Sequence, residues 1–208
     1  MESLAEIARL VRNCTDCPLH QGTTNAVPGE GSPHAEIMFI GEGPGYQEDR
    51  QGRPFVGPAG QLLDELLASI GLSREQVFIA NMVKHRPPQN RDPLPAEISA
   101  CSKYLDRQIE LINPSLIVTL GRFSLARFFP GESISRARGR LRRKDGRNIF
   151  PVMHPAAGLH RQELRATIAQ DFKAIPEALA AARHGPAGPA PISQEEETPP
   201  PPEQLALF

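Results

Sequence analysis

The sequence predicts an α/β fold, in which helices cover both faces of a central, mainly parallel, four-stranded sheet. Four short apolar runs rich in β-formers are each closed by Gly, Pro, Asn or a polar cluster. Segments with helical features separate these runs along the chain. Continuous apolar runs are typical of parallel strands that are buried on both faces. Their alternation with helices therefore predicts a three-layer α/β/α arrangement.

The expected elements follow one another in a regular order. Strands are expected at residues 36–41, 77–82, 116–120 and 148–153. Helices are expected at residues 3–12, 58–70, 95–112, 122–129 and about 162–182. Ligands of such sheets bind at the carboxyl ends of the strands. Because Gly41 opens a glycine-rich loop after the first strand, Asn81 ends the second and His154 follows the fourth, these elements are expected to meet on one rim.

Composition places the chain among ordinary globular proteins. Of its 208 residues, 39% are hydrophobic and 23% are charged, which suits one domain with a sizeable core and an appendage. No apolar run approaches the roughly 20 residues that span a bilayer, and the first residues lack the pattern of a signal peptide. We therefore expect a cytoplasmic protein without a membrane partner, and a monomer as the default. In such a reducing compartment, Cys14 and Cys17 suggest a metal site or a redox pair rather than a disulfide.

Basic residues are concentrated in residues 136–147. Residues 185–208 contain four acids and no Lys or Arg, so residues 1–184 hold 23 basic against 20 acidic residues. The arginine-rich stretch could neutralise several phosphates of a nucleic acid. A solvated surface loop explains the same residues equally well.

The composition changes after His184. Residues 185–203 are rich in Pro and Glu and poor in apolar residues, which predicts a disordered linker. The chain then ends in an apolar cluster, QLALF, at residues 204–208. Three parts are therefore expected: a domain at 1–184, the linker at 185–203 and a terminal peptide at 204–208.

Two loops have features of a ligand site. GEGPG at residues 41–45 lets backbone approach a ligand closely, although Pro44 removes a donor that a phosphate cradle would use. Phe55 lies in a stiff, glycine-bracketed turn, where it could form a platform for a flipped base. Alternatively, Phe55 is an ordinary core residue.

Taken together, the motifs resemble those of the family-4 uracil-DNA glycosylases, the iron–sulfur branch of the uracil glycosylase superfamily. The similarity covers residues 14 to about 165. The matching stretches are GEGPG (41–45), EDRQGRPFVGPAGQLLDELL (48–67), NMVKHRPPQNRDPLPAEI (81–98), IVTLGR (117–122) and HPAA (154–157). The resemblance implies a uracil-DNA glycosylase-like fold and removal of uracil from DNA, the first step of base-excision repair.

The resemblance also implies a role for each matching residue. Cleavage of the uracil–deoxyribose bond produces a cation-like sugar and a uracil anion. Glu42 matches the catalytic acid that stabilises the sugar and activates water, and His154 matches the donor to uracil O2. Asn81 matches the reader of the uracil edge. By themselves, Asn81 and His154 could equally be structural residues at strand ends. Further substrate contacts are expected from Gly41, Gly43, Phe55, Tyr46 and Glu48.

The family pattern implies a 4Fe-4S cluster held by four cysteines. Cys14, Cys17 and Cys101 match three of them, but His85 occupies the fourth position. Imidazole is a competent iron ligand, so ligation by His85 is expected. Alternatively, the histidine at position 85 is coincidental, and water or His20 fills the fourth ligand position of the cluster.

A DNA substrate changes the interpretation of the basic stretch. Arg138, Arg140 and Arg142 are then expected to bind phosphates. Leu159 matches the position of the wedge that replaces the extruded base, although an ordinary helix-start leucine is the alternative. The terminal peptide resembles the motif that binds the bacterial DNA polymerase sliding clamp, and this points to a bacterial source. Its expected anchors are Gln204, Leu205, Leu207 and Phe208.

Two other functions use the same motifs. An offshoot of the family that carries the His substitution becomes covalently trapped on uracil-DNA through a histidine in a basic insertion. The corresponding stretch here, residues 86–91, is short and contains no histidine, so turnover is expected. The other function is an iron–sulfur DNA-binding or redox module without glycosylase activity.

Overall fold

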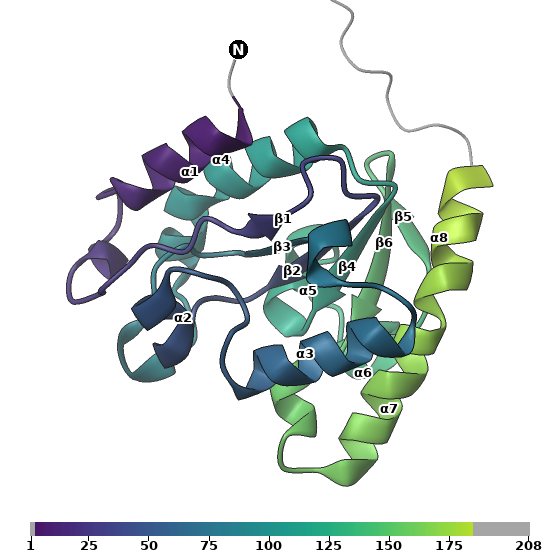
Figure 1. The fold of residues 1–208 in the computed structure, drawn as a ribbon. Coiled ribbons are helices and arrows are strands. Elements are labelled where there is room, and N and C mark those ends of the chain that lie inside the picture. The colour runs from purple at the N-terminus through teal and green to yellow at the C-terminus, as the bar shows by residue number, and fades with distance from the viewer. Residues whose placement is uncertain (1–2, 185–208) are drawn as a thin grey trace, which may run out of the picture.

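A six-stranded sheet lies at the centre of the computed structural model, which describes residues 3–184 (Figure 1). The strand order is β1-β3-β2-β4-β6-β5. Its four inner strands run parallel, as predicted. They are β3 (Phe78–Asn81), β2 (Ile37–Gly41), β4 (Leu116–Leu120) and β6 (Arg147–Val152).

Two short antiparallel strands at the edges extend the predicted four-stranded sheet to six. They are β1 (Glu30–Gly31), which pairs with β3, and β5 (Arg142–Lys144), which pairs with β6. Both strands are polar and only partly covered. An edge strand buries little surface, so it lacks the apolar run from which the inner strands were predicted.

Helices cover both faces of the sheet, which confirms the three-layer prediction (Figure 1). Alternate residues of β2 point to opposite faces, so that Ile37 and Phe39 belong to one core cluster and Met38 and Ile40 to the other. The first face is covered by α3 (Pro58–Ser69), α7 (Gln162–Lys173) and α8 (Ile175–His184). The second face is covered by α1 (Leu4–Arg12), α4 (Pro95–Ile112) and α5 (Arg122–Phe128).

The predicted helix at about 162–182 is in fact two helices, α7 and α8. The break lies at Ala174, whose N–H donates to Asp171 O at 3.1 Å rather than four residues back. Pro176 follows in the first turn of α8. Proline has no N–H to continue a helix and its ring crowds the preceding turn, so it is tolerated only where a new helix begins.

Several short elements had no signal in the sequence, because they are too short for apolar periodicity. They are the helices α2 (Tyr46–Gln51) and α6 (Ile134–Ala137), and the 3₁₀ turns η1 (Pro18–His20), η2 (Arg74–Gln76), η3 (Pro88–Asn90) and η4 (Pro155–Gly158). Within residues 3–184, no helix combines the length and the apolar character needed to cross a bilayer.

The strand order determines where a ligand can bind. The second parallel strand, β3, lies on one side of β2, and the third, β4, lies on the other side of β2. Such a reversal opens a crevice at the carboxyl ends of the strands. In this chain, the crevice lies next to the loops that follow β2, β3 and β6.

Candidate active site

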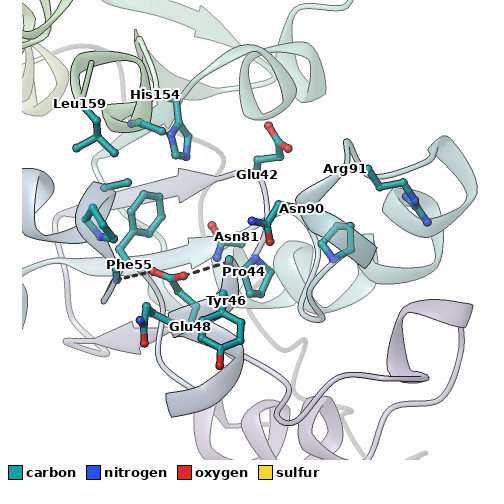
Figure 2. Close-up of a pocket in the computed structure, with 18 residues that line it drawn as sticks. Glu42, Pro44, Tyr46, Glu48, Phe55, Asn81, Asn90, Arg91, His154 and Leu159 are labelled. Carbon is teal, nitrogen blue, oxygen red and sulfur yellow. Dashed lines mark hydrogen bonds between the residues drawn. The ribbon is translucent and has the colours of Figure 1, made fainter. Parts of the chain in front are cut away.

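A cavity of ≈ 440 Å³ opens at the carboxyl ends of β2, β3 and β6 (Figure 2). Most of the predicted catalytic and substrate-binding residues line it. These are Glu42, Gly43, Tyr46, Glu48, Phe55, Asn81 and His154. The structure thus brings together the glycine-rich loop, the end of β3 and the turn after β6 at the carboxyl ends of the strands, as the sequence predicted.

Asn81 lies at the end of β3 and is only 1% exposed. Neither its amide nitrogen nor its amide oxygen has a hydrogen-bond partner in the protein. A buried polar atom without a partner costs about 1–3 kcal/mol, so folded proteins rarely keep one without a function. An amide that presents a free donor and a free acceptor to a cavity is suited to bind a complementary pair of groups.

Gly41 makes room for this amide. A Cβ at Gly41 would lie 2.6 Å from Phe55 Cζ and would overlap with Asn81 Oδ1. Gly41 itself is not among the residues that line the cavity. Its lack of a side chain lets the Asn81 amide and the Phe55 ring lie next to each other. This requirement explains the glycine at the end of β2.

Phe55 is buried in the cavity wall with a backbone φ of 52°, a strained conformation for a bulky residue. Its ring stacks on His154, with 5.6 Å between ring centroids and 27° between planes. Arg74 holds the turn, since its Nη1 donates to Phe55 O at 3.0 Å and its Nη2 donates to Pro54 O at 2.5 Å. The same guanidinium is paired with Glu30, which fixes it against β1.

His154 follows β6, and its Nδ1 accepts a hydrogen bond of 3.2 Å from the backbone N–H of Ala156. This bond leaves Nε2 as the protonated nitrogen of the neutral ring. Burial lowers the pKa of His154 to about 4. The side chain is thus a neutral N–H donor at physiological pH.

Glu42, the residue directly after β2, is half-buried in the cavity wall (Figure 2). Burial raises its pKa; Asp92 raises it further, and Arg122 lowers it. Asp92 and Arg122 form an ion pair of 2.5 Å with each other. A carboxylate with a raised pKa is a better base and a better stabiliser of positive charge than a solvated one.

Glu48 lines the cavity, and backbone N–H groups bind its carboxylate. Its contact with the substrate stays a prediction. Its Oε1 accepts from the N–H groups of Val56 and Gly57, both at 2.8 Å, and its Oε2 accepts from Gly45 N at 3.1 Å. The carboxylate therefore braces the two loops of the cavity. Tyr46 lines the mouth and is 53% exposed, with the Arg86 guanidinium 5.2 Å from its ring centroid.

The predicted phosphate-binding arginines differ in their surroundings. Arg138 donates to both carboxylate oxygens of the buried Asp171, at 2.6 and 2.8 Å, which favours a structural role. Arg142 is paired with Glu132, and lies on β5 opposite Ile149 in the middle of β6. Arg140 is exposed. Binding of phosphate by these residues stays a prediction; Arg140 is the one of the three that is exposed rather than partly buried.

Leu159 lines the cavity but is partly buried against the main core cluster. This packing is typical of a structural leucine, so its role as a wedge also stays a prediction. The predicted linker and the anchors Gln204, Leu205, Leu207 and Phe208 lie outside the described residues.

The three cysteines lie close to one another beside α1 and α4. Cys101 belongs to a small buried cluster, against which Cys14 and Cys17 pack. Burial is the main cause that raises the pKa of Cys101 to about 11; Lys84 works against this rise, and the other two thiols add to it. Lys84 N donates to Cys101 Sγ at 3.3 Å. His85, the next residue, is 6% exposed.

No group of three or more His, Cys, Asp or Glu side chains within residues 3–184 is arranged to hold a single metal ion. A four-iron cluster places its ligands around a larger body than one ion does. Three free thiols in one neighbourhood, one of which accepts a backbone N–H, agree with the donor set of such a cluster.

Sequence reasoning missed two residues that hold this site. Arg74 fixes the Phe55 turn, and Lys84 donates from its Nζ to Asn81 O at 3.1 Å. Arg74 has no local signal, because its partners are 10 to 44 residues away. Lys84 is part of a matching stretch, but nothing in the sequence shows that its side chain is buried.

Comparison with known proteins confirms the resemblance seen in the motifs. The sequence model of the Uracil DNA glycosylase superfamily matches residues 28–179. The chain is 54% identical to a Type-4 uracil-DNA glycosylase of Sulfurisphaera tokodaii, over 85% of either protein. It is 48% identical to that of Archaeoglobus fulgidus, over 85% of this chain and 94% of the relative. It is 47% identical to the Type-4 uracil-DNA glycosylase of Thermotoga maritima, over 83% of this chain and 93% of the relative.

Proposed function

Because this chain belongs to the uracil DNA glycosylase superfamily, we propose that it hydrolyses the N-glycosidic bond of deoxyuridine in DNA and so starts base-excision repair. The observation that carries the proposal is the buried amide of Asn81, which faces the cavity with both polar atoms unpaired. An amide of this kind complements the edge of uracil, where O4 accepts and N3–H donates.

The flipped base enters the cavity beside Phe55. Extrusion of a base costs its stacking energy, and stacking on an aromatic ring contributes about 1–3 kcal/mol in return. Phe55 is suited to this role because Arg74 and Gly41 hold its ring beside the reading amide. The platform is therefore in place before DNA binds.

His154 stabilises the leaving group. When the C1′–N1 bond breaks, its electron pair stays on uracil, and negative charge develops on O2. The Nε2–H of the neutral imidazole donates to this oxygen. The Ala156 N–H on Nδ1 keeps the ring in the tautomer that can donate there, and the low pKa keeps the ring neutral.

Glu42 acts on the other product of bond cleavage. Its carboxylate stabilises the cation-like sugar and accepts a proton from the water that adds to C1′. The oxygen of water replaces N1 at C1′, and the uracil anion takes up a proton to leave as neutral uracil. The reaction therefore needs no co-reactant besides water.

We assign the 4Fe-4S cluster to Cys14, Cys17, Cys101 and, as the fourth ligand, His85. Support comes from the thiols that gather beside α4 and from the Type-4 name of the relatives. It also comes from the burial of His85, which directly follows the residue whose N–H contacts Cys101. The cluster supplies structural organisation, because the catalytic residues act by hydrogen bonds and charge alone.

The remaining parts bring the enzyme to its substrate. Arg140 binds backbone phosphates of the DNA, and the peptide at 204–208 binds the bacterial DNA polymerase sliding clamp through a linker at 185–203. The enzyme acts as a monomer in the cytoplasm. These assignments rest on the sequence pattern.

Incubation of the purified protein with a labelled single-stranded oligonucleotide that contains one uracil tests the activity. We expect a strand break only after alkali treatment, and loss of this break in Glu42→Ala and His154→Ala. A band shifted on a denaturing gel without alkali would instead show covalent trapping. An unchanged oligonucleotide in both assays would favour a DNA-binding module and contradict the proposal.

The ligand assignment is tested by iron and sulfide analysis and by visible absorbance. His85→Cys is expected to keep four irons per chain, and His85→Ala to lose iron or to shift the absorbance. A His85→Ala protein with the iron content and spectrum of the wild type would show that another group fills this corner, with His20 the nearest candidate to test next.

A further inference from the structure

Lys84 is a buried cation to which the proposed reaction assigns no role. Its side chain is among the largest fully buried ones, and the residue is only 1% exposed. Lysine is almost never fully buried unless its ammonium group has partners. The partners of this one therefore indicate what the residue does.

The ammonium group is bound by two oxygens of neutral groups. Nζ donates to Gln108 Oε1 at 2.8 Å and to the backbone oxygen of Asn81 at 3.1 Å. Gln108 is itself 2% exposed, and its Nε2 donates to Pro28 O at 2.7 Å. The side-chain amide of Gln108 on α4 thus anchors the ammonium group of Lys84, which in turn holds the peptide group of Asn81.

The main chain of Lys84 is fixed as firmly as its side chain. Its N–H donates to Cys101 Sγ at 3.3 Å, and its carbonyl accepts from Val27 N at 2.7 Å. The side chain folds back three residues to reach Asn81 O, so that it closes the turn that follows β3. Both ends of this turn are then attached to α4.

From this geometry we infer that Lys84 is a positioning residue for uracil recognition: its ammonium group fixes the Asn81 peptide, and through it the direction of the Asn81 side chain. The inference rests on the proposed function of Asn81. An amide without protein partners has nothing else among the described residues to hold its χ angles except packing, so its backbone must be fixed for the free donor and acceptor to keep their places.

A double-mutant cycle separates this role from general support of the fold. Lys84→Met keeps the length of the side chain and removes the ammonium group. We expect it to lower kcat/KM for uracil release from DNA about tenfold, as for loss of a hydrogen bond to a charged donor. In an Asn81→Ala background, where no amide remains to be positioned, Lys84→Met is expected to cost less than about twofold.

Two further measurements and a control variant accompany the cycle. Affinity for DNA with an abasic site, which offers no base edge, is expected to stay within about twofold of the wild type in Lys84→Met. The visible absorbance per chain is also expected to stay unchanged, since the cysteine ligands remain. Lys173→Met, the same substitution at an exposed lysine at the end of α7, serves as the matched control.

An equal loss of kcat/KM in both backgrounds, or no loss in either, would overturn the inference. If Lys84→Met does not yield folded protein, Gln108→Met removes one of the two acceptors of Nζ, and its smaller loss, about threefold, must likewise vanish with Asn81→Ala. A wild-type protein that releases no uracil would overturn the proposed function itself, whereas an active wild type with an additive cycle would overturn only the role of Lys84.

Discussion

Replacement of Asn81 by leucine is expected to make the protein more stable and inactive at once. Leucine has nearly the shape of asparagine but no polar atoms. In the wild type, the amide nitrogen and oxygen of Asn81 are both buried without a partner in the protein. At the low end of the cost of such atoms, about 1 kcal/mol each, the substitution removes about 2 kcal/mol of unfavourable free energy from the folded state.

Part of this gain is lost to crowding. The site is tight, because a Cβ at Gly41 would already overlap with Asn81 Oδ1. The methyl groups of leucine are larger than the polar atoms they replace, and overpacking of a core costs about 1 kcal/mol or more. A net stabilisation of about 1 kcal/mol then raises the midpoint of thermal unfolding by about 2–4 °C for a chain of this length.

The assay compares unfolding midpoints and the rate of uracil release at the same pH for Asn81→Leu, Asn81→Ala and the wild type. Asn81→Leu is expected to lower kcat/KM at least about 100-fold, as for loss of an essential donor in an active site. Asn81→Ala is expected to be as inactive as Asn81→Leu but less stable than Asn81→Leu, because alanine leaves a cavity. If Asn81→Leu unfolded at a lower temperature than the wild type, the expected relief from the unpaired amide would be absent and the reasoning would be refuted.

Four other substitutions test separate parts of the protein. Because burial lowers the pKa of His154 to about 4, below its usual value in the unfolded chain, the unfolded state binds more protons between about pH 6.5 and pH 4. Stability is therefore expected to fall as the pH drops through this window, and His154→Gln should lessen the fall in denaturant titrations; an identical pH dependence would contradict this. Arg138→Ala breaks the partly buried pair with Asp171 and should destabilise the fold by about 2 kcal/mol in urea unfolding without changing the salt dependence of DNA binding, whereas Arg140→Ala should reduce the slope of log K against log salt by about 1 and leave stability unchanged. The opposite pattern would exchange their roles. Gly41→Ala should lower kcat/KM about tenfold or more, because the added methyl displaces the reading amide, and wild-type activity in a folded Gly41→Ala protein would show that the pocket can yield there.

The inner strands could be predicted because their burial leaves a direct trace in the sequence. Each inner strand of the sheet reads as a short apolar run, and the buried residues of β2 and β4 are continuous. The edge strands have no such trace, because one side of each faces solvent. Likewise, Pro176 divides α7 from α8 although the apolar spacing continues across it.

The site was predictable where residue type and position determine the chemistry, and less so where partners do. Asn81 ends a strand, and Glu42 and His154 follow strands, so the topology alone brings these residues together. Glu48 is bound by the N–H groups of Val56 and Gly57, which lie 8 and 9 residues further along the chain. Arg138 is paired with Asp171, which lies 33 residues away. A carboxylate that braces loops and one that faces a sugar look the same in a sequence.

The carboxylate of Glu48 has a consequence for how this site is studied. It accepts three backbone N–H groups, from Gly45, Val56 and Gly57, which belong to the two loops that frame the cavity. Truncation of Glu48 would release both loops and silence turnover as thoroughly as removal of Glu42. An alanine scan scored by product alone would therefore report two indispensable acids, and it would not distinguish the one proposed to act on the sugar from the one that braces the loops.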